Sequence, residues 1–335
     1  MTNHLSVPRS SDVAHPCETR DPARETADVA RRAARHDRTM TAVIELDHLT
    51  KRYGAARGIE DLSLSVERGE VFGFLGPNGA GKTTTIRTLL DLLHPTSGQA
   101  RIFGLDSHRE RPAIHARLGN LPGDFAYDPR LTGRDLLGFL AELRGVRDLG
   151  RARALAERFQ ADLERPLGEL SRGNRQKIGL VQSAFHDPEL LMLDEPTGGL
   201  DPLMQEAFLD FVAEERDRGR TVFLSSHELD EVERCCDRVG IIRDGRLVAV
   251  ESVADITGRA YRHVTLQFAD RVDPDEFRRL AGVIDLEPDG RVIAFKATGD
   301  IDAVIKTAAR HTVTDIELVR PTLEEVFLTY YGIST

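Results

Sequence analysis

The segment GPNGAGKT (76–83) combines the residue types that hold phosphate groups in proteins. It fits the spacing G-x-x-x-x-G-K-[ST] and lies between a short apolar run and a helix-like run. Backbone N–H groups of such a loop point at an anion, Lys82 can reach the β- and γ-phosphates, and the Thr83 hydroxyl can bind Mg²⁺. A chance glycine-rich turn is the alternative, and the flanking strand and helix disfavour it. The residues expected around the phosphates are Gly76, Pro77, Asn78, Gly79, Ala80, Gly81, Lys82, Thr83 and Thr84.

Two adjacent carboxylates, Asp194 and Glu195, follow the apolar run that begins at Leu190. Open α/β sheets bind ligands at the carboxyl ends of their strands, which is where this pair would lie. We expect Asp194 in the Mg²⁺ shell and expect Glu195 to polarise or deprotonate the attacking water. A strand-end pair that only caps the next turn is the alternative, but the phosphate loop upstream favours the catalytic interpretation.

The elements that must position these residues alternate between strand-like and helix-like stretches from about residue 41 to 256, which predicts an α/β layer architecture. The runs VFGFLG (71–76) and TVFLSS (221–226) are typical of buried parallel strands. Amphipathic patterns between about 126 and 178 predict an inserted helical subdomain, including helices over RDLLGFLAELRG and RARALAERFQADL.

The two ends of the chain differ from this core. Residues 257–335 predict a small α+β domain of the order β-α-β-β-α-β, ferredoxin-like, with a hairpin at Asp289-Gly290 and a closing helix over LEEVFLTYYG. Residues 1–40 have few large apolar side chains and are expected to be disordered. Met40 directly precedes the first strand-like run, so translation starting at Met40 is a hypothesis.

The sequence disfavours two classes of protein: those that bind nucleic acid and those that span the membrane. The 335 residues carry a formal net charge of −10, whereas phosphate backbones usually attract a basic excess. The sequence has neither the roughly 18–20 consecutive apolar residues of a membrane span nor the apolar core of a signal peptide. We therefore expect a cytoplasmic location.

The three cysteines form no disulfide framework and no CxxC pair. Cys17 stands alone, and Cys235 and Cys236 are adjacent. The pair could be a redox site, but we expect it on a helix that begins near Glu228, with one thiol packed inward and inert.

The motifs in their order resemble the nucleotide-binding domains of ABC transporters from about Ile44 to Ile256. LSRGNRQ (170–176) is similar to the LSGGQ signature of that family, and GGLD (198–201) resembles its D-loop. The resemblance implies a P-loop NTPase fold of the ABC type, with antiparallel β and helical subdomains, that binds ATP and Mg²⁺ and hydrolyses ATP.

Two further residues acquire a role through this resemblance. His227, after TVFLSS, resembles the switch histidine of the family, and Tyr53, in KRYG, matches the aromatic residue that stacks on adenine. Such stacking is worth about 1–3 kcal/mol. With Lys82 and Glu195, His227 completes the set of expected catalytic residues.

The family pattern also implies that ATP is sandwiched between two such domains, in a homodimer or pseudo-dimer. Ser171 and Gly173 would contact the γ-phosphate of the ATP held by the other domain, Asp201 would link the two sites, and His227 would hold the γ-phosphate. Closure of donors over the γ-phosphate would gate the reaction.

Two departures from the family pattern stand out. The signature has Arg172 and Asn174 where Gly and Gln are commonest, and we expect it to function. The position of the Q-loop glutamine falls on Gly123, followed by Asp124, and glycine has no side chain to bind Mg²⁺ or sense the γ-phosphate. Asp124 acting through water and a site that tolerates the loss are both open.

The wording GNRQK, the ending PTLEEVFLTYYG and the lack of fused spans are similar to ATPases paired with ABC-2 type permeases, which typically drive export and include daunorubicin-resistance ATPases. This implies a separate integral membrane permease, which chooses the substrate, and a chain held at the inner face of the cell membrane.

Two other functions compete with transport. A soluble ABC ATPase acting on ribosomes or DNA usually has two nucleotide-binding domains in one chain or long coiled coils, and neither is evident. A regulatory module that binds ATP but hardly hydrolyses it is disfavoured by intact Lys82, Asp194 and Glu195, although Gly123 keeps it open.

Overall fold

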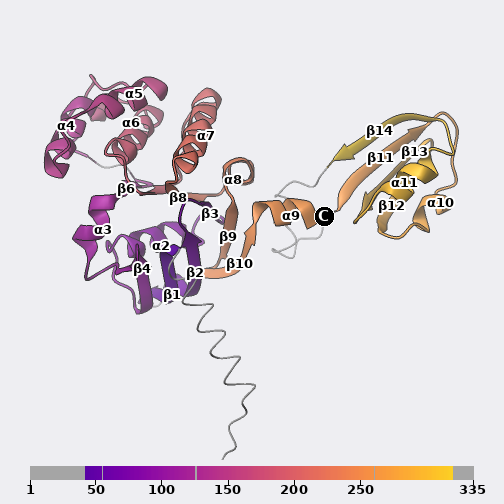
Figure 1. Ribbon diagram of the computed structural model, residues 1–335, viewed down its shortest axis with the longest axis horizontal. Coiled ribbons are helices and arrows are strands. Elements are labelled where there is room, and N and C mark those ends of the chain that lie inside the picture. Colours follow the sequence, from indigo (N-terminus) through magenta and orange to yellow (C-terminus); the bar gives the residue numbers. More distant parts are fainter. Residues whose placement is uncertain (1–41, 55, 125–126, 260, 320–335) are drawn as a thin grey trace, which may run out of the picture. The chain divides into compact units, whose positions relative to one another are not determined.

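The computed structural model describes residues 42–54, 56–124, 127–259 and 261–319 (Figure 1). The expectations for residues 1–40, for a start at Met40, for Cys17 and for the closing helix over LEEVFLTYYG lie outside these ranges. Within them the strands form three sheets, of four, six and four strands, and helices connect the strands of the largest. The predicted α/β fold with an additional antiparallel sheet is confirmed.

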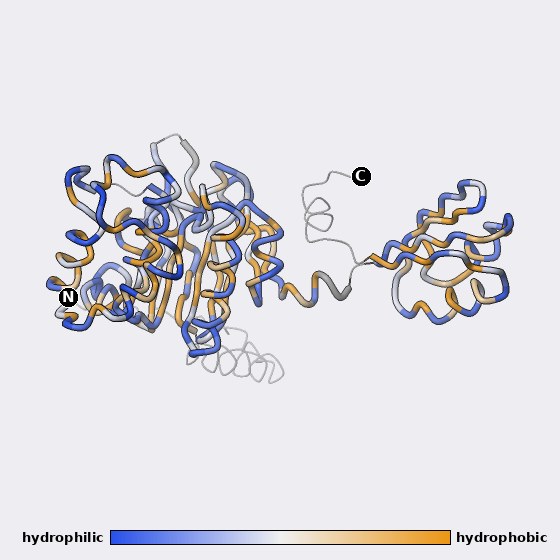
Figure 2. Tube along the Cα trace, turned by 90° about the horizontal axis from the view of Figure 1, so that it is seen from above, coloured by the Kyte–Doolittle hydropathy of each residue, from blue (hydrophilic) through white to orange (hydrophobic). Residues whose placement is uncertain are grey.

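The six-stranded sheet is the frame of the region that carries the phosphate loop, with the order β10-β9-β3-β8-β7-β6. All neighbours pair in parallel except β10, which runs antiparallel at the edge. Every residue of β3, β7 and β8 is buried, as the continuous apolar runs predicted, and hydrophobic colour follows these central strands in Figure 2. The strands are β3 (Val71–Leu75), β6 (Leu118–Leu121), β7 (Leu190–Asp194), β8 (Thr221–Ser226), β9 (Arg238–Arg243) and β10 (Arg246–Ser252).

An antiparallel sheet of the order β2-β1-β4-β5 covers the large sheet. Its inward side chains share one core with Phe72 of β3 and Phe223 of β8, whose rings stack at 5.7 Å between centroids, and with Ile86 after the phosphate loop. The loop is therefore supported by both sheets. The strands are β1 (Ala42–Tyr53), β2 (Ala56–Glu67), β4 (Ser97–Ile102) and β5 (Leu105–Asp106).

The helices of this region include the predicted helical group, α4 to α6 (Figure 1). A capping box between Thr132 and Asp135 begins α4, and Gly145, with φ 68°, ends it. The next helix is shorter than predicted, because Gln160 has a left-handed backbone, with φ 50°, and the Ala161 N–H bonds back to the Ala156 carbonyl oxygen at 2.9 Å, which ends the helix. The helices are α2 (Lys82–Leu89), α3 (Arg111–Arg117), α4 (Gly133–Arg144), α5 (Gly150–Arg158), α6 (Arg172–Ala184), α7 (Pro202–Asp217), α8 (Leu229–Cys235) and α9 (Val253–Arg259), with a 3₁₀ turn, η1, at Leu167–Glu169.

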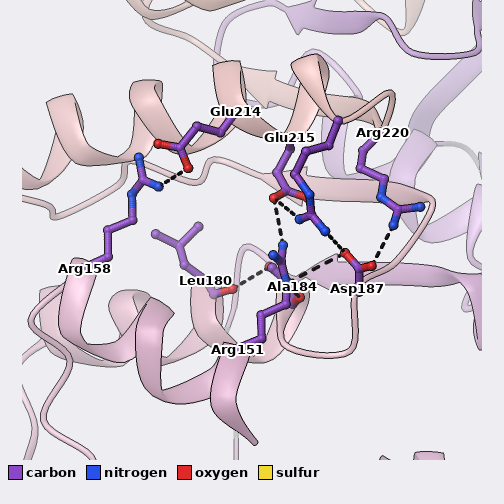
Figure 3. Close-up of polar contacts among 10 residues, drawn as sticks. Arg151, Arg158, Leu180, Ala184, Asp187, Glu214, Glu215 and Arg220 are labelled. Carbon is purple, nitrogen blue, oxygen red and sulfur yellow. Dashed lines mark hydrogen bonds and ion pairs between the residues drawn. The ribbon is translucent and has the colours of Figure 1, made fainter. Parts of the chain in front are cut away.

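An ion-pair network joins α5 to α7 (Figure 3). Arg151 of α5 and Arg218 both donate to Glu215 Oε1, at 2.7 and 2.8 Å, and Glu215 is buried. Arg218 and Arg220 also pair with the two oxygens of Asp187, each at 2.7 Å. Because a buried carboxylate needs such partners, the network fixes α5 against the end of α7.

Residues 262–319 form a separate four-stranded antiparallel sheet with two helices, in the chain order β-α-β-β-α-β that the sequence predicts. Its strand order is β12-β13-β11-β14, and its core contains Phe268, Phe277 and Phe295. The elements are β11 (Arg262–Phe268), α10 (Asp275–Arg278), β12 (Val283–Asp289), β13 (Val292–Ala297), α11 (Asp302–Ala308) and β14 (Val313–Val319). That it is a domain of its own stays a prediction.

The cysteine pair lies at the end of α8, which begins one residue after Glu228. Both Cys235 and Cys236 are buried, so the expectation of one inward thiol is wrong: the last residue of the helix and the first after it both face the core. Burial, together with the neighbouring thiol, raises the pKa of Cys236 well above its usual value, which makes it unreactive as a nucleophile.

Among the helices of the described ranges, none has both the length and the apolar character needed to cross a bilayer.

Candidate functional site

The phosphate loop connects β3 to α2 at the carboxyl edge of the large sheet. Gly81 precedes the first helical residue with φ 114°, and a Cβ there would lie 2.8 Å from Cγ2 of Ile59. Glycine is therefore needed both for the backbone conformation and for the close approach of β2. The free N–H groups at the start of α2 face the loop, which suits an anion.

A cleft brings residues of the loop and one acidic residue, Glu195, together. Tyr53 lies beside it: a Cβ on Gly58 would come within 3.1 Å of the Tyr53 ring, which is 43% exposed. The ring is thus available for stacking at the end of β1. The residues lining the cleft are Gly58, Asn78, Gly79, Gly81, Lys82, Thr83, Thr84 and Glu195.

Lys82 holds its ammonium group between the loop and the acidic strand. Its side chain is only 4% exposed, and Nζ donates to the carbonyl oxygens of Gly76 at 2.7 Å and Pro77 at 3.3 Å. The carboxylate oxygen Oε1 of Glu195 lies 3.4 Å from the same nitrogen. A positive charge is therefore fixed at the floor of the cleft.

The acidic pair is positioned by the neighbouring strand β8. Asp194 pairs in register with Ser225, whose Oγ donates to Asp194 Oδ1 at 2.5 Å. The backbone N–H of Glu195 donates to the oxygen atoms of the same serine, to Oγ at 3.1 Å and to the carbonyl at 3.2 Å. One serine therefore holds both carboxylate residues in place.

Glu195 has a left-handed backbone, with φ 50°. Such a conformation costs a non-glycine residue about 1–3 kcal/mol and is concentrated at functional sites. It directs the side chain out of the strand toward the cleft, where it is 30% exposed. His227, after β8, places Nδ1 3.5 Å from Oε1 of the same carboxylate, so Lys82 and His227 both approach Glu195.

The signature residues do not lie in the cleft of the same chain. Ser171 caps α6, which begins inside the signature rather than after it, by accepting from the Asn174 N–H at 3.2 Å. A Cβ on Gly173 would lie 2.5 Å from the Gly199 carbonyl oxygen, so the signature packs against the GGLD segment. Asp201 caps α7 in the same way as Ser171 caps α6. These residues form a second surface, outside the phosphate cleft.

Gln176 connects the two surfaces, a role that the sequence did not indicate. Its amide nitrogen donates to the carbonyl oxygens of Glu195 and Pro196, at 3.0 and 2.9 Å, and the side chain is buried. Ser225 was missed as well. Its only signal in the sequence is a polar residue at the end of an apolar run, and strand pairing is needed to show what it contacts.

Comparisons with known proteins agree with the resemblance that the sequence motifs indicate. A profile described as "ABC transporter" matches residues 59–198. The bacitracin transport ATP-binding protein of Bacillus licheniformis is 37% identical over 238 residues, which cover 69% of this chain and 77% of that protein. The chain belongs to the ABC transporter family.

A longer match extends past the ATP-binding region of this ABC protein. A daunorubicin resistance ATP-binding protein of Streptomyces coeruleorubidus is 36% identical over 303 residues, 86% of this chain and 96% of that protein. A solved ATP-binding subunit of an ABC transporter matches with a TM-score of 0.59 and 31% identity, over 64% of this chain and 92% of that one. As a member of the family, the chain binds ATP and hydrolyses it to power transport.

Gly123, at the Q-loop position of the ABC pattern, lies directly against the acidic strand. A Cβ on Gly123 would lie 2.9 Å from Oδ2 of Asp194, closer than real contacts allow. Asp124, in contrast, is 93% exposed, and its carboxylate lies 3.7 Å from Arg87. The side chain that could replace the missing glutamine thus points to solvent, whereas the glycine makes room for Asp194.

A buried carboxyl group, that of Glu231, contacts the residue that precedes His227. Ser226 Oγ donates to Glu231 Oε2 at 2.6 Å and accepts from the Glu228 N–H at 2.9 Å. Burial, with smaller contributions from the negative charges of Glu228 and Glu195, raises the pKa of Glu231 to about 7. The segment that carries His227 is therefore anchored on a carboxyl group that titrates near neutral pH.

We predict that Gly123→Ala lowers the kcat of ATP hydrolysis by about 10- to 100-fold, because the new Cβ displaces the Asp194 carboxylate from its position on Ser225. Asp124→Ala, next to it in the chain, is the control and should change kcat by less than about twofold, since an exposed charge contributes little. Steady-state phosphate release measures both. Full activity of Gly123→Ala would contradict the role given to Gly123. A large loss of activity in Asp124→Ala would show that Asp124 takes part in hydrolysis.

We predict that Glu231→Gln stabilises the protein at high pH only. The pKa of Glu231 is about 7 in the folded chain and 4.5 without the fold. Between these values the folded state keeps a proton that the unfolded state releases, so the wild type loses stability as pH rises. The loss reaches about 3 kcal/mol above pH 7 and is absent below about pH 4.5.

Glutamine keeps an acceptor for Ser226 and has no charge to bury, so the difference in unfolding free energy between the two proteins should grow over this pH range. Urea titrations of both proteins at several pH values measure it. A difference independent of pH would contradict the assignment.

Proposed function

We propose that two copies of this chain, or this chain and a similar one, bind ATP between the phosphate loop of one and the signature of the other. Hydrolysis of that ATP then drives export through a separate membrane permease. The arrangement of two surfaces carries the proposal: Lys82 and Glu195 face the cleft, whereas Ser171 lies outside it on the start of α6.

The cleft can hold the triphosphate through charge and backbone amides. The start of α2 supplies N–H groups, and the buried ammonium of Lys82 supplies a positive charge next to them. Phosphate oxygens would replace the loop carbonyl oxygens as acceptors for Lys82. The exposed ring of Tyr53, beside Gly58, offers a surface for adenine.

Mg²⁺ fits the oxygen groups beside the phosphates. Thr83, whose side chain carries a hydroxyl group, is one of the residues that line the cleft. Ser225 occupies Oδ1 of Asp194, and within the described residues no group donates to Oδ2, which faces Gly123. Hard oxygen ligands are those that Mg²⁺ prefers, and it retains several waters, so Thr83 and Asp194 would hold it and it would offset the charge of the phosphates.

Hydrolysis depends on Glu195 and His227. The carboxylate of Glu195 points into the cleft from the end of β7 and can orient a water molecule or accept its proton. His227, 3.5 Å from that carboxylate, can donate to the γ-phosphate. Ser225 and the strained backbone of Glu195 keep the carboxylate in position before substrate arrives.

The second copy would complete the site. Ser171 and Gly173 present a helix start whose N–H groups suit the γ-phosphate of a facing chain, and Asp201 lies on the same surface, 3.8 Å from Lys177. Gln176 then ties this surface to the backbone of Glu195. Closure of the dimer would thus be felt directly by the hydrolytic carboxylate.

The names of the relatives support export rather than import, because they refer to bacitracin transport and daunorubicin resistance. The substrate would be a drug-like or antibiotic molecule chosen by the permease, with the chain at the cytoplasmic face of the membrane. A ribosome- or DNA-bound ATPase and a regulatory ATP-binding module are the alternatives.

We predict that Glu195→Gln lowers kcat by about 10²- to 10⁴-fold and leaves ATP binding intact, because it removes the base but not the phosphate contacts. With ATP and Mg²⁺ the variant should elute as a dimer from a sizing column. Glu228→Gln, an exposed glutamate nearby, is the control and should match the wild type. Wild-type turnover in Glu195→Gln would exclude the proposed role.

The association of the chain distinguishes transport from its alternatives. Expressed with a candidate permease, the chain should purify with the membrane fraction and show hydrolysis sensitive to Glu195→Gln. Association with ribosomes or DNA instead, without any membrane protein, would reverse the ranking, and an ATP-binding wild type without turnover would favour the regulatory module.

We predict that two inactive variants complement each other. Lys82→Ala removes the phosphate cation and Ser171→Arg blocks the signature, so each protein alone should lose hydrolysis. Mixed dimers contain one site with an intact loop and an intact signature, so an equal mixture should recover up to about a quarter of wild-type activity. No recovery, with dimers demonstrated by sizing, would place the signature outside the active site.

A further inference from the structure

A cluster of three metal-ligating side chains lies at the far end of α2, away from the phosphate loop. Asp91, His94 and His108 each direct one ligand atom to a common point, and these atoms lie within 4.8 Å of one another. The eight residues of α2 separate the cluster from the loop by about 12 Å along the helix axis. The cluster plays no part in the ATP site described above.

Asp91 is held in a conformation that suits a ligand. Its backbone is left-handed, with φ 56°, directly after α2, and its side chain is only 3% exposed. Glycine would fit this backbone at lower cost, yet the position has a buried carboxylate. Arg111 donates to Oδ2 at 3.3 Å, which leaves Oδ1 directed at the two histidines.

The two imidazoles reach Oδ1 from different segments. Nδ1 of His94, in the loop after α2, lies 3.1 Å from Oδ1, and Nδ1 of His108, before α3, lies 2.9 Å from it. The rings are 4.8 Å apart between centroids and inclined at 82°. The turn that carries His108 is fixed by Asp106, which accepts from the His108 and Arg109 N–H groups.

We propose that Asp91, His94 and His108 form a Zn²⁺ site. Zinc bonds of about 2.0–2.2 Å in a tetrahedron separate the ligand atoms by about 3.3 Å. The spacings of the two nitrogens from Oδ1 therefore need to widen by a few tenths of an ångström, and the two nitrogens, which lie within 4.8 Å of each other, need to approach the same separation. The histidine side chains are 70% and 62% exposed, so the rings have room to adjust, their protons can move to Nε2, and a water can occupy the fourth position.

The ligand set selects a transition metal. Two imidazoles and one carboxylate suit zinc, whereas Mg²⁺ and Ca²⁺ need more oxygens. The positive charge of Arg111, which pairs with Asp91, also weakens the binding of any cation that is held by charge alone. The bonds from the metal to the imidazole nitrogens therefore have to supply the affinity. This site is thus chemically distinct from the oxygen-rich Mg²⁺ site of Thr83 and Asp194.

Zinc would join two segments that flank the nucleotide site. Asp91 and His94 follow the phosphate-loop helix, and His108 precedes α3, which leads into β6. Within the protein, His115 of α3 already contacts the Leu90 carbonyl oxygen at 3.1 Å. A bound ion would strengthen this junction and stabilise the folded state by mass action.

Competition with a chromogenic zinc chelator tests the proposal on the full chain, after treatment with EDTA and desalting. The wild type should bind one more equivalent of Zn²⁺ than the double variant His94→Ala/His108→Ala, in which all other histidines and cysteines remain. Each single variant should weaken this binding by at least about 100-fold. Added Zn²⁺ should raise the melting temperature of the wild type more than that of the double variant.

Two further variants separate ligation from folding. Asp91→Gly suits the left-handed backbone and should keep the fold but lose the zinc. His311→Ala removes a histidine that pairs with Glu276 of α10, and it should bind zinc like the wild type. Co²⁺ in the wild type should show visible d–d bands without thiolate charge transfer. Equal zinc binding by the wild type and the double variant would overturn the proposal. Thiolate charge-transfer bands that disappear when the cysteines are replaced would overturn it as well.

Discussion

The parallel pairing of β3, β8 and β7 is the constraint from which the ATP site follows. Parallel strands end at the same edge of a sheet, so the phosphate loop after Leu75, His227 and the acidic pair meet there although they are far apart in the chain. The register adds precision, because Asp194 lies opposite Ser225 and its carboxylate accepts the serine hydroxyl. A slip of one residue between β7 and β8 would place the Asp194 and Ser225 side chains on opposite faces of the sheet and destroy the site.

In the proposed dimer, this edge of one chain supplies only part of each ATP site. The two nitrogen-bearing side chains near the Glu195 carboxylate, those of Lys82 and His227, come from the same chain, but the signature residues are not among those that line the cleft. Gln176 is the physical connection, because it bonds from the signature helix to the backbone carbonyl of Glu195. In the proposed dimer, movement of α6 would therefore reach the carboxylate through a single buried side chain.

Much of this could be predicted from the sequence because its signals are local. The phosphate loop has a fixed spacing, and the continuous apolar runs of β3, β7 and β8 predict buried parallel strands. Ser225 and Gln176 could not be predicted, since their roles depend on which strand or loop lies beside them. The inward packing of both Cys235 and Cys236 and the start of α6 at Arg172 also depend on helix ends, which local patterns define poorly.

Gly123 shows how a missing side chain can be compatible with catalysis. A Cβ at this position would lie 2.9 Å from Oδ2 of Asp194, so any other residue would have to displace that carboxylate from the place that Ser225 gives it. In the proposed Mg²⁺ site, the oxygen that a glutamine would have offered would come from water, which Mg²⁺ retains readily. In the proposed mechanism, detection of the γ-phosphate would then rest on His227, whose Nδ1 lies 3.5 Å from Oε1 of Glu195. Sensing of the γ-phosphate and activation of water would thus be coupled through these two side chains rather than through the segment that leads to the helical group.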